Sequence, residues 1–167
     1  MIFGLSIGAF TTLHTIISLV AIAAGIVVLA LLIVGRMART VTLLYLTASI
    51  LTDITGFMFY KGSFGPPYII GLLSLIILLV ACYALYGAKL AGAWRGTWAI
   101  TAVIGLYLNV FVLVVQGFGK LPALHALAPN GSEPPFAIAQ GVTLLVFVAL
   151  GWMAFTRFRP ATTPASA

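Results

Sequence analysis

The sequence contains very little charge. Only 6% of its 167 residues are charged, and just two are acids, Asp53 and Glu133. Soluble domains carry about 25% charged residues, so this composition cannot form the surface of a water-soluble globular protein. The eight lysines and arginines are scattered along the chain. They form no basic stripe, so the sequence indicates no nucleic-acid partner.

Cysteine is also scarce. The single cysteine, Cys82, excludes an internal disulfide, and we interpret it as a small packing residue. The chain contains no CxxC, P-loop, GxSxG or HExxH motif. No nucleophile–base pair can be read from the sequence either. The pattern therefore favours a non-enzymatic role.

Apolar residues are abundant and come in long runs. They make up 63% of the chain, and the mean hydropathy is +1.24. Runs of about 20 apolar residues are typical of membrane-spanning helices, and the ten-residue alternation of a membrane barrel is missing. We delimit five segments, at 12–34, 42–59, 68–87, 98–118 and 136–155. The predicted fold is all-α, a polytopic membrane protein with a single five-helix domain over residues 1–160.

Both ends of the chain differ from these segments. Residues 1–10 lack the basic region of a secretory signal, so we interpret them as an interfacial prelude or as part of a tilted first helix. The tail at 161–167, "ATTPASA", is small and polar, and we predict that it is disordered.

The basic residues predict an orientation. Five spans put six of them on one side of the membrane and only Lys61 and Lys120 on the other. The six are Arg36, Arg39, Lys89, Arg95, Arg157 and Arg159. Under the positive-inside rule the N-terminus is outside and the C-terminus cytoplasmic. The 119–135 loop is then periplasmic in a Gram-negative cell.

Strongly polar side chains gather in the outer half of this arrangement. The candidate ligand-binding residues are His14, Asp53, Asn109, Gln116, His125, Glu133 and Gln140. Helical phase puts His14 on the same stripe as the small residues Ser18 and Gly25, so we expect it to face other helices. In the same way, four helices could each direct a polar side chain toward one shared site in the outer half of the bundle.

Each of these residues also has a plainer interpretation. An acid such as Asp53 in hydrocarbon is protonated or partnered, and it is a functional candidate by default. Asn109 and Gln116 would serve as hydrogen-bonding contacts between helices. His125 and Glu133 would be ordinary solvated loop residues.

The stretch "GKLPALHALAPNGSEPPF", residues 119–136, stands out between two apolar segments. Pro122 and Pro129 restrict it, and three leucines between or beside them gain free energy by burial. We predict an ordered cap over the outer end of the bundle. The cap should include at least one hydrogen bond from His125 or Glu133 to another segment.

Several stretches carry a resemblance to a known family. "LHTIISLVAIAAG", "GAWRGTW" and the run from Leu106 to Gln140 resemble small multi-pass inner-membrane proteins that are widespread in proteobacteria and have no assigned activity. The resemblance covers most of the chain and implies a bacterial inner-membrane location. The residues that match the family pattern are His14, Asn109, Gln116, His125 and Glu133. The chain departs from it at Asp53, where the family carries a small hydroxyl residue, and at Tyr68, where it favours histidine.

Four functional hypotheses follow. The first is a non-catalytic accessory or assembly subunit of a larger membrane complex, with the lipid bilayer, other subunits or a second copy as partners. The second is a bundle with an outer-side site for a quinone, a haem or a metal ion. The third is a proton-coupled transporter, which a lone intramembrane acid and the lack of a visible inverted repeat disfavour. A membrane enzyme is the fourth.

Overall fold

The computed structural model describes residues 2, 4–59 and 65–159, and these residues are helical with no strand. The elements are α1 (Ile7–Ile33), α2 (Arg39–Phe57), α3 (Pro66–Cys82), η1 (Tyr83–Gly87), α4 (Trp94–Lys120), α5 (Pro122–His125) and α6 (Pro134–Arg157). Among them, α1, α2, α3 with η1, α4 and α6 are long and apolar enough to cross a membrane. The predicted all-α bundle with five potential spans is confirmed. The predicted disordered tail lies outside the described residues.

The long helices begin earlier than the hydrophobic segments suggested. α3 and α6 start at the prolines of Pro-Pro pairs, because proline is tolerated in the first turn, where its missing N–H has no partner to lose. α1 begins at Ile7, where the Ser6 hydroxyl accepts a hydrogen bond from the Ala9 amide at 3.2 Å. Residues 7–10 therefore belong to the first helix, whose 27 residues make it about 40 Å long.

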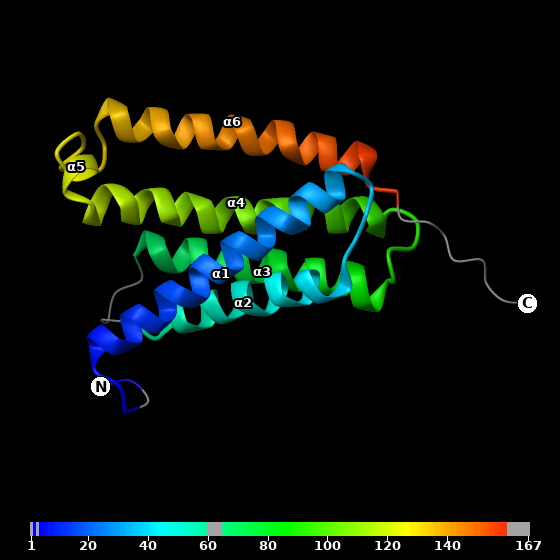
Figure 1. The fold of residues 1–167 in the computed structure, drawn as a ribbon, viewed down its shortest axis with the longest axis horizontal. Helices are drawn as coiled ribbons and strands as arrows, with labels where there is room; N and C mark the ends of the chain where they lie inside the picture. The colour runs from blue at the N-terminus through cyan, green and yellow to red at the C-terminus, as the bar shows by residue number, and fades with distance from the viewer. Residues whose placement is uncertain (1, 3, 60–64, 160–167) are drawn as a thin grey trace, which may run out of the picture.

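The bundle has two different ends (Figure 1). One, the α5 end, carries the N-terminus and α5. The other, the basic end, carries the connections at 34–38 and 88–93 and the end of α6. All described lysines and arginines except Lys120 lie at or beside the basic end.

The chain turns at the basic end through residues with positive φ. Gly35 follows α1 at φ +73°, and the next amide, from Arg36, bonds back to the Leu31 carbonyl at 2.8 Å. This is the Schellman arrangement, which favours glycine. The π-helical turn η1 ends α3, and Lys89 and Leu90 follow it at φ 49° and 61°.

Glycines allow the helices to pack closely. α4 packs against α1, α3 and α6, whereas α2 packs between α1 and α3. A Cβ atom on Gly25 of α1 would lie 2.6 Å from Leu106 of α4, and one on Gly105 would lie 2.9 Å from the Tyr45 hydroxyl of α2. α1 therefore crosses α4 at the Gly25–Leu106 contact and then runs obliquely away from it toward the α5 end (Figure 1).

Candidate functional site

The buried face of α2 is polar along most of its length. Thr42, Tyr45, Ser49 and Asp53 follow one another three or four residues apart and are all buried. This spacing puts them on one side of the helix. The Tyr45 hydroxyl donates to the Ala102 carbonyl of α4 at 2.7 Å. An apolar bundle thus contains a polar seam along the side of α2 that faces its neighbours.

Ser49 and Asn109 form the best-defined polar contact in this seam. The Asn109 Nδ2 group donates to Ser49 Oγ at 3.1 Å, and both side chains are buried. Hydrogen bonds of this kind between membrane helices contribute about 0.6 kcal/mol on average. The contact fixes α2 against α4, which is the plainer of the two roles predicted for Asn109.

Asp53 and Ser74 have unpaired polar atoms near each other. Asp53 is 8% exposed and Ser74, on α3, is 3% exposed. The Ser74 hydroxyl is near enough to interact with the Asp53 carboxyl group. The two groups are not hydrogen-bonded to each other, because neither Asp53 Oδ2 nor Ser74 Oγ has a hydrogen-bond partner. Leaving such groups buried and unpaired is costly in an apolar medium.

His14 pairs with α2 at the α5 end. Its Nδ1 lies 2.7 Å from Thr55 Oγ1, and its ring meets Phe59 edge-on with centroids 5.3 Å apart. The Thr55 hydroxyl also lies 2.6 Å from the Leu51 carbonyl, so the His14 ring is joined to the backbone of α2 through this hydroxyl. The prediction that His14 faces other helices is confirmed.

The loop between α4 and α6 is bonded to the end of α4. His125 Nδ1 donates to the Phe118 carbonyl at 3.2 Å, which confirms a hydrogen bond from this loop to another segment. Leu124 lies over Gly117, and Ala128 is buried. Leu121 and Leu127 are 55% and 56% exposed, so contacts within the described part of the protein do not bury them. Whether they dip into the bilayer, as expected, stays a prediction.

Glu133 organises the turn that precedes α6. Its carboxylate accepts hydrogen bonds from the Asn130 backbone N–H at 3.0 Å, the Asn130 side-chain amide at 2.8 Å and the Ser132 N–H at 3.0 Å. The Asn130 backbone N–H, together with these other donors, holds the pKa of Glu133 below its ordinary value of 4.5. Its hydrogen bonds all stay within the loop.

The remaining amides do not join a common centre. Gln140 Nε2 donates to the Phe111 carbonyl of α4 at 3.2 Å, whereas Gln116 is exposed. Gln116 lies on the part of α4 beyond the crossing with α1, which has turned away (Figure 1). Among the described residues, the seven candidates are therefore held by separate local contacts instead of one hydrogen-bonded cluster. No three His, Cys, Asp or Glu side chains in the described ranges come together as a metal site would need.

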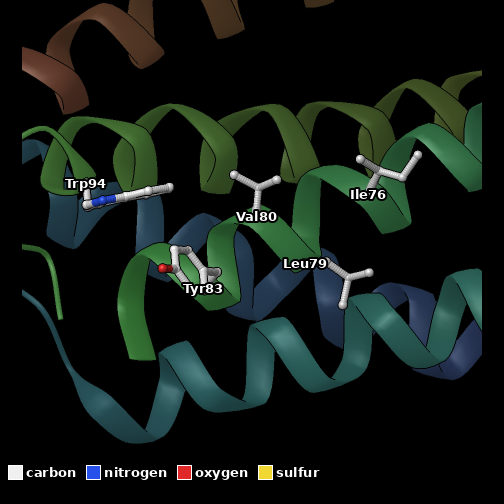
Figure 2. A pocket seen from close by; sticks show the side chains of 5 residues that line it. All are labelled: Ile76, Leu79, Val80, Tyr83 and Trp94. Atoms are coloured by element: carbon white, nitrogen blue, oxygen red, sulfur yellow. The ribbon is translucent and has the colours of Figure 1, made fainter. Parts of the chain in front are cut away.

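Two hollows on the described surface are relevant here. One, of about 250 Å³, lies beside α5 and is lined by His125, Asn130, Phe118, Phe136 and neighbouring residues. The other, of about 320 Å³, is an apolar groove between α3 and α4 near the basic end (Figure 2). There Tyr83 and Trp94 meet edge-on with ring centroids 4.9 Å apart. The groove contains no charged or metal-binding side chain.

Sequence reasoning missed the hydroxyl partners of the site. Ser49, Thr55 and Ser74 each lie beside one of the predicted residues. Helical phase placed Ser49 and Ser74 on inward faces, but serine and threonine are common in membrane helices and carry no motif. The comparisons of the chain with protein-family models, curated proteins and solved structures find no match.

Proposed function

We propose that the protein is a multi-pass inner-membrane protein of bacteria, acting as a non-catalytic accessory or assembly subunit of a larger membrane complex. Five apolar helices support membrane insertion. The excess of arginine and lysine at one end supports a cytoplasmic basic end and an outer α5 end.

The observation that carries the subunit proposal is the exposure of α6. Leu145 and Trp152, 70% and 69% exposed, are the two most exposed large apolar side chains of the described residues. Together with Ile138, 64% exposed, they repeat every seven residues along one face. Seven-residue spacing is the pattern that helices use to pack side by side. This face fits a helix of another subunit.

The use of the polar groups supports the same proposal. Asn109, Gln140, His14 and His125 each bond a neighbouring helix or backbone carbonyl. Side chains committed to such contacts stabilise a scaffold and leave few groups for chemistry on a substrate.

A photo-crosslinking experiment in native membranes tests the proposal. A benzoylphenylalanine replaces Leu145 on α6 and, as a control, Ile76 on α3, which is 51% exposed at a similar distance from the α5 end. We expect an adduct of defined mass from position 145 and none from position 76. On native gels of gently solubilised membranes, Leu145→Trp should release the protein from its assembly, whereas Ile76→Trp should not. A wild-type chain that migrates as a monomer and gives no adduct at position 145 would contradict the proposal.

The hollow beside α5 favours a second candidate, a ligand site for an amphipathic molecule such as a quinone. Phe118 and Phe136 meet edge-on at 5.4 Å and form apolar walls. His125 and Asn130 add polar side chains. Apolar walls with a few polar groups are the usual composition of small-molecule sites. Quinone content of the purified protein tests it. Retention should fall in His125→Ala and stay unchanged in Ser132→Ala.

A further inference from the structure

Asp53 and Ser74 form the least satisfied polar contact in the described interior. Both side chains are more than nine-tenths buried, and each has an oxygen without a partner. Several other helical hydroxyls, such as those of Thr52 and Ser18, donate to the carbonyl one turn earlier. The Ser74 hydroxyl makes no such bond, so it stays available to the acid beside it.

Among the described residues, no positively charged side chain pairs with Asp53. The side chain that acts on its carboxyl group is Ser74, and Asp53 Oδ2 accepts no hydrogen bond from any described residue. The ionisable groups on the helices around it are His14 on α1, Arg39 and Tyr45 on α2, Tyr68 and Cys82 on α3, and Arg95, Tyr107 and Lys120 on α4. Arg39 and Arg95 lie near the basic end, away from Asp53. His14 is bonded to Thr55 and Tyr45 to the Ala102 carbonyl. An unpaired carboxylate in such surroundings is unfavourable, so the group must bind a cation or a proton.

The geometry favours the proton. A metal cation needs several oxygen ligands around it, whereas the side chain that acts on the Asp53 carboxyl group is the single hydroxyl of Ser74. Asp53 lines neither of the two hollows described above. A proton needs no such space. It also supplies the missing donor, because a neutral carboxylic acid can donate its O–H to a hydroxyl oxygen.

We propose that Asp53 is an intramembrane proton-binding site, in which a neutral carboxyl group donates its O–H to Ser74 Oγ. Ser74 Oγ, which has no hydrogen-bond partner among the described residues, is the acceptor. The site lies four residues from the last residue of α2, Phe57, or about 6 Å along the helix from the α5 end. This assignment does not depend on whether the protein is a subunit of a larger assembly.

The composition of the chain allows a direct spectroscopic test. Asp53 and Glu133 are its only side-chain acids, so the infrared carbonyl region of the purified full-length protein has almost no background from other carboxyl groups. At pH 7 we expect one carboxylic-acid C=O band, which is lost in Asp53→Asn and retained in Glu133→Gln. Ser74→Ala should keep the band and shift it to higher frequency, because its hydrogen-bond acceptor is gone.

Carbodiimide labelling tests the site without mutation. Dicyclohexylcarbodiimide adds a protonated carboxyl group across its C=N bond: the acid proton moves to nitrogen, the carboxyl oxygen bonds to carbon, and the adduct rearranges to a stable N-acylurea. Peptide mass spectrometry should find the label on Asp53 and none on Glu133, which is ionised. A folded wild-type protein at pH 7 with carboxylate bands only and no label on Asp53 would overturn the proposal, and sodium-dependent carboxylate bands would assign the site to a metal cation instead.

Discussion

The contact of Tyr45 of α2 and Leu78 of α3 with Gly105 of α4 gives the sharpest test of the packing. At Gly105 an added Cβ would lie 2.9 Å from the Tyr45 hydroxyl and 2.9 Å from Leu78 Cδ2. Both contacts are shorter than carbon atoms tolerate, and all three residues belong to the interior. Gly105→Ala should therefore push α2 and α3 away from α4 and weaken the bond between Tyr45 and Ala102.

The size of the effect follows from three terms. Overpacking a close-packed site costs about 1–3 kcal/mol, and disturbing the Tyr45 hydrogen bond adds about 0.5–1.5 kcal/mol. Alanine gains about 1 kcal/mol over glycine in helix propensity, which offsets part of this. We expect Gly105→Ala to lower the free energy of unfolding by about 0.5–3.5 kcal/mol.

A double-mutant cycle isolates the contribution of the hydroxyl. Tyr45→Phe removes the oxygen that the new methyl group would strike, so Gly105→Ala should cost less in that background than in the wild type. Heating the protein in detergent with a thiol-reactive fluorophore provides the assay, because Cys82 is its only thiol and is half-buried. Gly141→Ala is the matched control, since nothing lies within 4 Å of its added Cβ. The close packing of Gly105 against Tyr45 and Leu78 is refuted if Gly105→Ala is as stable as the control. It is also refuted if Gly105→Ala costs as much stability in the Tyr45→Phe background as in the wild type.

Three further predictions can be checked separately. In a Cys82→Ala background, Ser132→Cys should react with an impermeant maleimide in intact cells, and Ala93→Cys only after the membrane is opened; the reverse pattern would invert the proposed orientation. Because the folded-state pKa of Glu133 lies below its ordinary 4.5, the stability it contributes is complete above about pH 4.5 and is lost as pH falls through the lower folded value. Thermal melts should lose this pH dependence in Glu133→Gln and keep it in Ser132→Ala. Thr55→Val removes the oxygen that His14 Nδ1 contacts, so the His14 ring should lose its Nδ1 hydrogen bond in nitrogen NMR spectra, whereas Thr52→Val should leave it intact.

The sequence predicted the number and type of the helices because apolar runs of span length are a strong signal. It misplaced their starts, since proline was interpreted as a break at Pro66 and Pro134, where it begins a helix. Helical phase predicted that His14 points inward, and that was correct. Phase put Gln116 on the same face as Asn109, but only Asn109 is buried.

This difference has a physical cause. Helical phase tells which residues share one face of a single helix. Whether a residue on that face is buried depends on where the neighbouring helices cross. The crossing angles are set by side-chain packing between helices. The close approach at Gly25 brings α1 onto the middle of α4 and leaves the part with Gln116 uncovered. The partners of His14 and Asn109 depend on the relative register of two helices, which no single-segment pattern contains.

The helices of the bundle differ in the contacts that hold them to their neighbours. α2 has the lowest hydropathy of the five potential spans, yet its polar residues face its neighbours: Thr55 meets α1, Ser49 meets α4 and Asp53 approaches Ser74 of α3. Between apolar helices in lipid there is no hydrophobic driving force, so such contacts and close glycine crossings decide which helices stay together. α6 is held in the same ways on the side that faces α4, by the Gln140 bond, by the Arg95 guanidinium on the Phe158 carbonyl, and by Gly96, whose added Cβ would lie 2.6 Å from Phe155. Its other side, with Leu145 and Trp152, stays exposed. A helix fixed to the bundle on one side and exposed on the other is the arrangement that the proposed subunit needs if it keeps its own fold while it presents one helix to a partner.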